Sequence, residues 1–537
     1  MTALVLGPLL RHVGEHTATI WVETSHPCRV RVHNEEHGLD AAARTFTVHG
    51  HHYALVEIDG LEAGARVPYA VDLDDTRVWP EGVTRFPPAQ IRTLDLSDGL
   101  QISFGSCRRA PDTARAFGED ALAALAHQLA DGGEGWPDAL LMVGDQVYAD
   151  ELSEEMRTFI RARRTEEPLD ELADFEDYTH LYKLAWNEDP AVRWLLATLP
   201  TFVIFDDHDI RDDWNTSYEW RVQMWREPWW RNRIVGGIAS YWVYQHLGNL
   251  SPQERAADPM YRAVREASAD GGDGGKILDE FAERADKQPD TARWSYAHEW
   301  GDVRLVVVDS RCSRLLTPDR RGMLDDAEFD WLDRQLRGDV DHLLIASSLP
   351  YLLAPAIHHG ENWNEAVAGG AWGPRMARFG EKLRQGADLE HWGAFDRSFR
   401  EVARDVIEVG RGERGRAPAS ISFLSGDVHY SYLARVTDPG TDSVITQVVC
   451  SPLRNPLPAA FRWANRLAVA RPTAALPRLL ARWAKVPKPP LRWRITDGPW
   501  FDNAIATVDL RGRSCRIRWE TPSSETTLTG MGAVDLT

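Results

Sequence analysis

The stretch Ala139-Leu-Leu-Met-Val-Gly-Asp-Gln-Val-Tyr-Ala-Asp150 places five apolar residues directly before a glycine and a group of polar residues. A short apolar run that ends at a turn is typical of a fully buried strand. Five more runs have this form: Leu100 to Phe104, Thr201 to Phe205, Arg304 to Val308, His342 to Ala346 and Ile421 to Leu424. Helical stretches lie between the runs, and this alternation predicts an α/β domain.

Every one of these runs ends on polar residues. The endings are Gly-Ser-Cys107, Gly-Asp145, Asp206-Asp207-His208, Asp309-Ser-Arg311, Ser347-Ser348 and Ser-Gly-Asp427-Val-His429. In open α/β sheets, ligands bind beyond the carboxyl ends of the strands. Six endings of this kind predict one large site at a shared sheet edge.

The residue types at this edge fit two kinds of metal site. Thiolate and phenolate are strongly donating anions, and an all-oxygen set suits calcium, magnesium or manganese. Two metals about 3.5–4 Å apart are the recurring arrangement for displacement at phosphorus. A trivalent transition metal would suit Cys107, Tyr148 and His429 with Asp145, and the all-oxygen set would be Asp145, Asp207 and Asp427. Asp145 could therefore bridge the two metals.

Residues 1–95 have a different character. The segments Ala18 to Glu23, Arg29 to His33 and Tyr53 to Ile58 alternate apolar and polar residues, which predicts half-buried strands. Gly60-Leu-Glu-Ala-Gly64, followed by Tyr69 to Leu73, resembles the late hairpin of a fibronectin type III sandwich. We expect an accessory β-sandwich without chemistry of its own, joined by a linker at Phe86-Pro-Pro to a second domain over residues 96–537.

Two inserts interrupt the second domain. Residues 214–300 are rich in tryptophan, which predicts either a helical layer whose indoles cover the core or a lid over the site. Residues 454–496 hold ten basic residues and no Asp or Glu, so the rest of the chain carries a charge of about −30. This basic insert could dock on the acidic body, or it could lie on an anionic membrane surface, although several prolines limit its helices.

The composition excludes some classes of function. A net charge of −20 argues against a general nucleic-acid binder, because a surface that follows phosphates needs excess Lys and Arg. Five scattered cysteines make a poor disulfide framework, so Cys28, Cys312, Cys450 and Cys515 are expected to be inert thiols. The apolar run from Ala3 to Leu10 reads poorly as a signal peptide, and we expect a cytoplasmic protein unless the start is misplaced.

Four blocks together resemble the alkaline phosphatase D (PhoD-like) family of calcineurin-like metallophosphoesterases. They are Gly105-Ser-Cys107, Gly144 to Asp150, Asp206 to Asn215 and Ser425 to His429, in matching order and spacing. The resemblance runs from about residue 96 to the C-terminus. It implies a four-layer αββα core, an iron–calcium type of centre and hydrolysis of phosphate esters.

The resemblance also implies roles for individual residues. Cys107, Asp145, Tyr148 and His429 would bind Fe³⁺, and Asp145, Asp207 and Asp427 would bind calcium, with magnesium, manganese or zinc as alternatives. His208 would stand beside the scissile phosphate and protonate the leaving oxygen or stabilise the transition state. Arg311 would contact the phosphate.

The chain departs from the wider superfamily in one respect. The usual additional histidine has no clear counterpart, and Ser347 and Ser348 stand roughly where it would fall. Asp206 and Asp150 are expected to orient their neighbours, and Asp309 to cap a helix or pair with Arg311. The pair His358-His359, in a stretch rich in Gly, Asn and Trp, is expected to lie at the surface or line a pocket.

The leading hypothesis is therefore a metal-dependent phosphomonoesterase or phosphodiesterase acting on a small or polymeric ester. A second hypothesis places the substrate on a membrane, as a lipid or polymer headgroup, with residues 454–496 as the anchor. A third is a metal-stabilised binding module without catalysis. The sequence leaves the natural substrate and the oligomeric state open.

Overall fold

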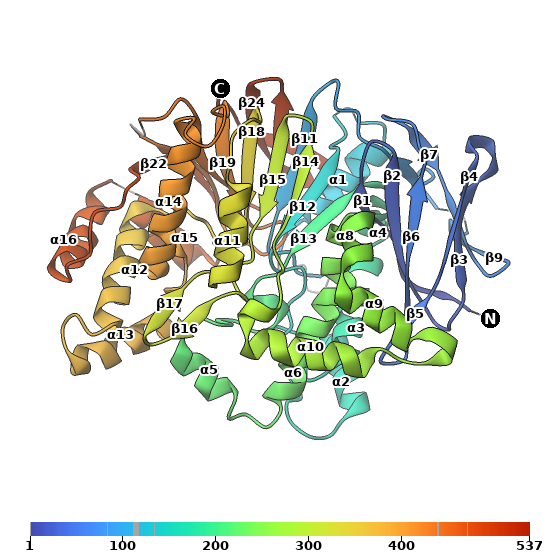
Figure 1. Cartoon of the computed structure of the whole chain (residues 1–537), viewed down its shortest axis with the longest axis horizontal. Helices are drawn as coiled ribbons and strands as arrows, with labels where there is room; N and C mark the ends of the chain where they lie inside the picture. The colour runs from blue at the N-terminus through green and yellow to red at the C-terminus, as the bar shows by residue number, and fades with distance from the viewer. Residues whose placement is uncertain (1, 83, 111–116, 134, 438–439, 470) are drawn as a thin grey trace.

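A β-sandwich at the N-terminus packs against a larger α/β body (Figure 1). The computed structural model describes the chain except residues 1, 83, 111–116, 134, 438–439 and 470. The sandwich has two antiparallel sheets. One sheet is ordered β1 (Leu4–Val13), β2 (Thr17–Thr24), β6 (His51–Asp59), β5 (Phe46–Val48), and the other β4 (Leu39–Arg44), β3 (Arg29–Asn34), β8 (Ala70–Leu73), β9 (Thr76–Trp79). The predicted sandwich is confirmed.

The body contains two mixed sheets. The first is ordered β13 (Thr201–Ile204), β12 (Ala139–Val143), β11 (Leu100–Gly105), β23 (Ile505–Arg511), β24 (Ser514–Ser524), β25 (Thr527–Asp535). The second is ordered β14 (Tyr296–Trp300), β15 (Val303–Val307), β18 (His342–Ala346), β19 (Ser420–Ser425), β21 (Val444–Val449), β20 (Ser431–Val436), β22 (Trp493–Trp500). All six apolar runs of the sequence are strands in these sheets.

The six strands belong to two sheets, so the prediction of one shared sheet edge was wrong. β11, β12 and β13 run parallel in the first sheet, and β15, β18 and β19 run parallel in the second. Each sheet contributes three polar endings to the same end of the body. Periodicity alone could not separate the sheets, because a buried strand reads the same in either one.

The second sheet is buried on both faces, and its side chains alternate between two cores. In β18, Leu344 and Ala346 belong to the core that also contains the first sheet. Leu343 and Ile345 of the same strand face a second core, shared with α11 (Asp326–Gln335) and α14 (Asp396–Gly410). Successive side chains of a strand point to opposite faces, which explains this division.

Helices cover the outer face of each sheet and complete the predicted four-layer αββα arrangement. On the first sheet, α1 (Ala121–Ala130) lies against β24 and β25, and α4 (Pro190–Thr198) lies beside α1. These helices begin where the sequence favours it. The Asp120 carboxylate accepts from the backbone N–H of Leu122, and Asp189 caps α4, which has a proline at its first position.

The tryptophan-rich insert forms a helical layer that contacts both the body and the sandwich. It comprises α5 (Tyr218–Met224), α6 (Trp230–Ser240), a π-helical turn (Tyr241–His246), α7 (Leu247–Asn249), α8 (Pro252–Ala257), α9 (Pro259–Ala267) and α10 (Gly275–Lys287). Trp214, Trp230 and Trp242 are fully buried, and Trp220 is buried. The indoles therefore cover the core, as one of the two predictions had it.

Buried arginines join the sandwich to the body. The Arg11 guanidinium donates to the backbone oxygens of Thr201, Tyr244 and Gln245 at 2.7–3.0 Å and to the Asn249 side chain at 3.2 Å. Arg255 donates in the same way to the Leu247 oxygen and to the Glu57 carboxylate. These bonds satisfy polar groups that the junction removes from water.

The basic insert forms two helices, α15 (Ala459–Val469) and α16 (Ala475–Trp483), at the end of the molecule opposite the sandwich (Figure 1). α16 packs on α12 (Pro355–Ala368). His358 and His359 lie on α12: His359 lines a cavity, as predicted, whereas His358 is a core residue, against the prediction. Within the described part of the chain, every helix is too short or too polar to span a bilayer.

Candidate metal centre

The predicted ligands stand directly after strands, in an unusual backbone conformation. Cys107 follows β11, Asp145 follows β12, and Asp427 and His429 follow β19. All four have a positive φ, between 50° and 65°. A side chain at positive φ costs about 1 kcal/mol or more, and such residues concentrate at functional sites.

Two glycines let the ends of the two sheets meet. A Cβ on Gly144 would lie 2.8 Å from the Asp206 Cβ and 2.9 Å from the Ser348 Cβ. A Cβ on Gly426 would lie 1.9 Å from the Ser106 Oγ. The Gly-Asp pairs at Asp145 and Asp427 therefore combine close approach of the backbone with a carboxylate at the point of contact.

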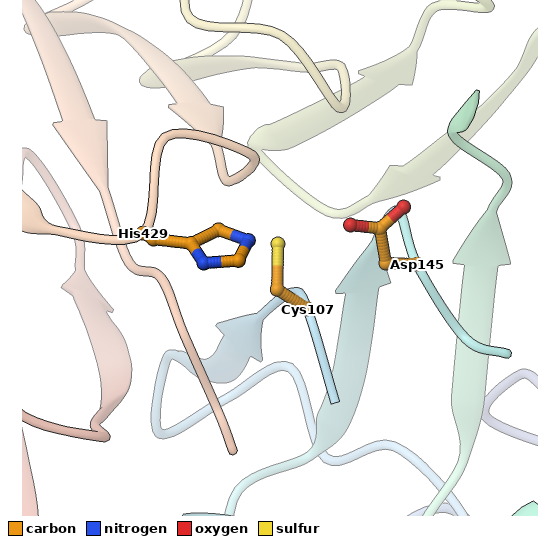
Figure 2. A group of neighbouring side chains, drawn as sticks. All are labelled: Cys107, Asp145 and His429. Carbon is orange, nitrogen blue, oxygen red and sulfur yellow. The ribbon is translucent and has the colours of Figure 1, made fainter. Parts of the chain in front are cut away.

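Cys107, Asp145 and His429 form the first group of candidate ligands (Figure 2). One ligand atom from each lies within 4.8 Å of the other two. The fourth residue assigned to this set, Tyr148, donates from its hydroxyl to the Asp145 Oδ2 at 3.3 Å. The structure thus gathers the thiol, phenol, imidazole and carboxylate at one place.

The second predicted set is arranged differently. Asp145 groups with Asp207 and His208, whereas Asp207 groups with Asp206 and Asp427, each within 4.8 Å. Asp207 belongs to both groups and so connects Asp145 with Asp427. Asp206, expected only to orient a neighbour, offers an oxygen in the same group as Asp427.

The electrostatics of these carboxylates fit bound cations. Burial, together with the neighbouring aspartates, raises the pKa of Asp145 and of Asp206 well above the ordinary value. Burial raises the pKa of Asp207 to about 6. The Asp145 Oδ1 and Asp206 Oδ2 are buried and have no hydrogen-bond partner among the described residues. A cation would supply the missing partner, and the mix of sulfur, nitrogen and oxygen donors suits transition and hard metals.

His208 lies beside both groups and is held by Asp150. Its Nδ1 is 2.9 Å from the Asp150 Oδ1, and its ring stacks at a tilt on Tyr148, with centroids 4.6 Å apart. Burial alone would lower the pKa of His208, but the Asp150 carboxylate raises it well above the ordinary value. The Asp150 carboxylate therefore favours the protonated ring, and the contact through Nδ1 leaves Nε2 on the side away from Asp150. Asp150 orients it, in line with its predicted position.

Arg311 is fully buried and surrounded by carboxylates. Its guanidinium pairs with Asp206 and Glu390, and lies 3.2 Å from Asp207. In this arrangement it neutralises and orients the aspartates. Contact with a phosphate stays a prediction. Asp309 accepts from the backbone N–H groups of residues 311–313, so it caps the turn and does not pair with the Arg311 side chain.

His391 is the most important residue that the sequence did not reveal. Its Nε2 donates to the Asp427 Oδ2 at 2.9 Å, and its Nδ1 donates to the Glu361 Oε1 at 2.7 Å. Burial lowers the pKa of His391, but Glu361 and Asp427 raise it well above the ordinary value. His391 lies in a loop after α13 (Pro374–Gly386), so no strand ending marked it. Ser348, which stands roughly where the additional histidine of the superfamily would fall, forms a hydrogen bond with Ser310 at 2.9 Å.

Other contributors come from the start of the basic insert and from the residues just before it. The Asn455 Nδ2 donates to the Tyr148 hydroxyl at 3.0 Å, and the Ser451 Oγ donates to the Cys107 Sγ at 3.3 Å. The other four cysteines are buried outside the groups of candidate ligands. Only contacts between distant segments identify these partners, and the sequence contains no local signal for them.

Two facing sheets with such a cluster at their carboxyl ends define a metallophosphoesterase. Residues 115–475 match the model of the PhoD-like phosphatase family, and residues 1–91 match a domain of unknown function, DUF7800. The chain therefore belongs to the PhoD-like phosphatase family, and it is a metal-dependent phosphoric ester hydrolase.

Solved structures resemble this fold. One entitled "Structure of PhoD" has a TM-score of 0.60 and 12% identity, over 98% of this chain and 89% of that one. A purple acid phosphatase from yellow lupin seeds has a TM-score of 0.49 and 10% identity, over 98% of this chain and 73% of that one. No curated protein matches the sequence.

Proposed function

We propose that the protein hydrolyses phosphate esters at a two-metal centre. The observation that carries this proposal is the position of Asp145, which lies within 4.8 Å of Cys107 and His429 on one side and of Asp207 and His208 on the other. A carboxylate between two groups of candidate ligands is what a bridging ligand requires. Recurring two-metal sites for displacement at phosphorus share ligands in this way.

The two groups differ in hardness, and this difference supports an assignment of metals. Cys107, Tyr148, His429 and Asp145 would hold Fe³⁺. The carboxylates of Asp207 and Asp427 with Asp145 would hold calcium, with magnesium, manganese or zinc as alternatives. Bound there, the metals supply Lewis-acid polarisation of the phosphoryl oxygens and a more acidic water. The pairing of Asp206 with Arg311 would reduce the negative charge beside the second metal site.

The protein's own residues supply the proton and its alignment. Asp150 fixes the His208 ring through Nδ1, which leaves the Nε2 proton for the leaving oxygen of the ester. The hydrogen bond from His391 holds the Asp427 carboxylate in place. The Asn455 side chain fixes the Tyr148 hydroxyl against the first metal site.

The test combines metal analysis with hydrolysis of p-nitrophenyl phosphate and bis-p-nitrophenyl phosphate. We expect the wild-type protein to hold two metals, with iron as one of them, and to cleave at least one ester. Cys107→Ser should lose the iron and the activity. Cys515→Ser changes another buried cysteine, outside the site, and is the matched control that should keep both.

The result against the proposal is equally concrete. Wild-type protein that binds no metal after reconstitution and cleaves neither ester would exclude it. Protein that binds a single metal and retains activity in Cys107→Ser would exclude the two-metal form of the mechanism. The ratio of the two ester activities then gives the preference for monoesters or diesters.

A further inference from the structure

Exposed large apolar side chains concentrate in the basic insert. Among the described residues, four of the six such side chains lie between residues 454 and 496: Phe461 (60% exposed), Leu476 (63%), Leu479 (41%) and Trp483 (63%). A tryptophan exposed to this extent loses the free energy of burial unless another surface covers it. The clustering of these residues indicates an interaction surface.

α16 divides its residues into three faces. Ala481 and Ala484 are buried toward the body. The spacing of Leu476, Leu479 and Trp483 places them on a second, exposed stripe. Arg478 and Arg482, four residues apart, form a third, also exposed face between the other two. The helix therefore presents an apolar stripe bordered by cations, as helices that lie in a bilayer interface do.

A basic cavity of about 300 Å³ opens beneath this helix. Arg478, Arg482, Lys488 and Arg492 line it together with His359, and no Asp or Glu does. The Arg478 Nε lies 3.3 Å from the His359 Nε2. Four cations around one cavity, in a chain with a net charge of −20, give it the chemistry to hold a phosphate group.

The insert is also anchored close to the metal centre. Leu457 and Val428 both pack against the core cluster that contains Tyr430, next in the chain to the candidate ligands Asp427 and His429. Asn455, at the start of the insert, binds the Tyr148 hydroxyl. A surface that docks through α16 would thus be held by the same part of the body that carries the site.

We propose that α16 and the cavity beneath it dock on an anionic phospholipid bilayer, with the apolar stripe among the acyl chains and a lipid headgroup phosphate in the cavity. Charge and apolarity together favour this partner. A nucleic acid or a soluble polyanion would use the arginines but would leave the Leu476–Trp483 stripe in water. The inference does not depend on the proposed two-metal mechanism.

Sedimentation of the full chain with lipid vesicles tests the proposal. We expect binding to phosphatidylcholine vesicles that contain roughly one-third phosphatidylglycerol, little binding to pure phosphatidylcholine, and loss of binding at high salt. Arg478→Gln with Arg482→Gln should weaken binding about tenfold or more. Leu479→Ser with Trp483→Ser should weaken it by a similar factor.

Matched variants give the controls. Arg262→Gln with Arg265→Gln on α9, and Phe379→Ser on α13, change exposed residues of the same types elsewhere and should bind within about twofold of wild type. Thermal midpoints establish that all variants fold. Wild-type protein that ignores anionic vesicles at low salt would overturn the proposal. Undiminished binding by the Leu479→Ser, Trp483→Ser variant would also overturn it, because binding by charge alone would leave the apolar stripe without a role. Sedimentation measures no turnover, so a failure of the phosphoesterase mechanism would leave this result unaffected.

Discussion

At the junction between the sandwich and the body, buried arginines meet full sets of acceptors, whereas at the metal centre several buried carboxylate oxygens meet none. Arg11 places its donors on four oxygens at 3.2 Å or less. At the centre, the Asp145 Oδ1 and the Asp206 Oδ2 have no hydrogen-bond partner among the described residues. Both regions remove charge from water, but at the centre Arg311 and His391 pair with only some of the buried carboxylate oxygens, and the oxygens named above stay without a partner.

This difference separates a structural from a functional use of buried charge. A buried polar group without a partner costs roughly 1–3 kcal/mol. The junction avoids that cost and stabilises the fold. The metal centre bears the cost of buried oxygens without partners. It also holds Cys107, Asp145, Asp427 and His429 in the left-handed backbone conformation. Its residues are therefore arranged for a ligand from outside the chain. Substitutions should therefore have opposite consequences in the two regions.

The largest effect is expected for Asp145→Asn. Turnover should fall on the order of a thousandfold, because the carboxylate proposed to bridge the two metals is lost. In the presence of a chelator, the same variant should unfold at a higher temperature than wild type, since a neutral amide replaces a buried carboxylate whose Oδ1 has no hydrogen-bond partner. Asp273→Asn is the matched control at the junction. There the carboxylate accepts from the backbone N–H groups of His49, Gly50 and Gly275, and its loss should destabilise by about 1 kcal/mol. The comparison breaks if both variants shift stability in the same direction.

His208→Gln should lower turnover about a hundredfold or more and leave the metal content unchanged. The reason is that His208 is proposed to donate a proton and not to bind a metal. Asp150→Asn should have a smaller effect in the same direction, since Asp150 orients the ring. Turnover and elemental analysis of both variants decide the matter. Turnover of His208→Gln within twofold of wild type would remove this residue from the mechanism.

Arg11→Met should destabilise the protein by about 3 kcal/mol in urea unfolding, because it leaves the buried carbonyls of Thr201, Tyr244 and Gln245 without this donor. Activity of the folded variant should be close to that of wild type. Arg397→Gln removes a surface pair with Glu401 and should cost about 0.5 kcal/mol or less. An equal loss of unfolding free energy in Arg11→Met and Arg397→Gln would show that the hydrogen bonds of the buried Arg11 do not stabilise the junction.

His51 gives the smallest and most specific test of the junction. It lies 2.8 Å from both Glu23 and Glu176, and these carboxylates outweigh burial and raise the pKa of His51 to about 9. A raised folded-state pKa gives stability that is complete below about pH 6.5 and is lost as the pH rises through about 9. The unfolding free energies of wild type and His51→Gln should differ by roughly 2 kcal/mol at pH 6 and converge near pH 10. His37→Gln, at an exposed turn, is the control. If the difference in unfolding free energy between wild type and His51→Gln stays the same from pH 6 to pH 10, the ion pairs of His51 with Glu23 and Glu176 are rejected.

The sequence predicted the strands and their polar endings because both are local properties. Alternation located β2, β3 and β6, and short apolar runs located the six parallel strands of the body. It did not predict that these strands divide between two sheets, since hydrophobic periodicity does not identify a neighbour. His391 and Asn455 were missed for the same reason. They reach the centre from segments distant in the chain, and only the packed structure brings them to Asp427 and Tyr148.

The chain that leads into the basic insert runs directly beside the first group of candidate ligands. The Arg454 N–H donates to the Cys107 oxygen at 3.2 Å, and the side chain of the next residue, Asn455, donates to the Tyr148 hydroxyl. Two binding events connected in this way obey linkage: if occupancy of the metal centre changes the affinity for a bilayer by some factor, contact with the bilayer must change metal affinity by the same factor. Vesicle binding measured with and without metal would give that factor as a single number.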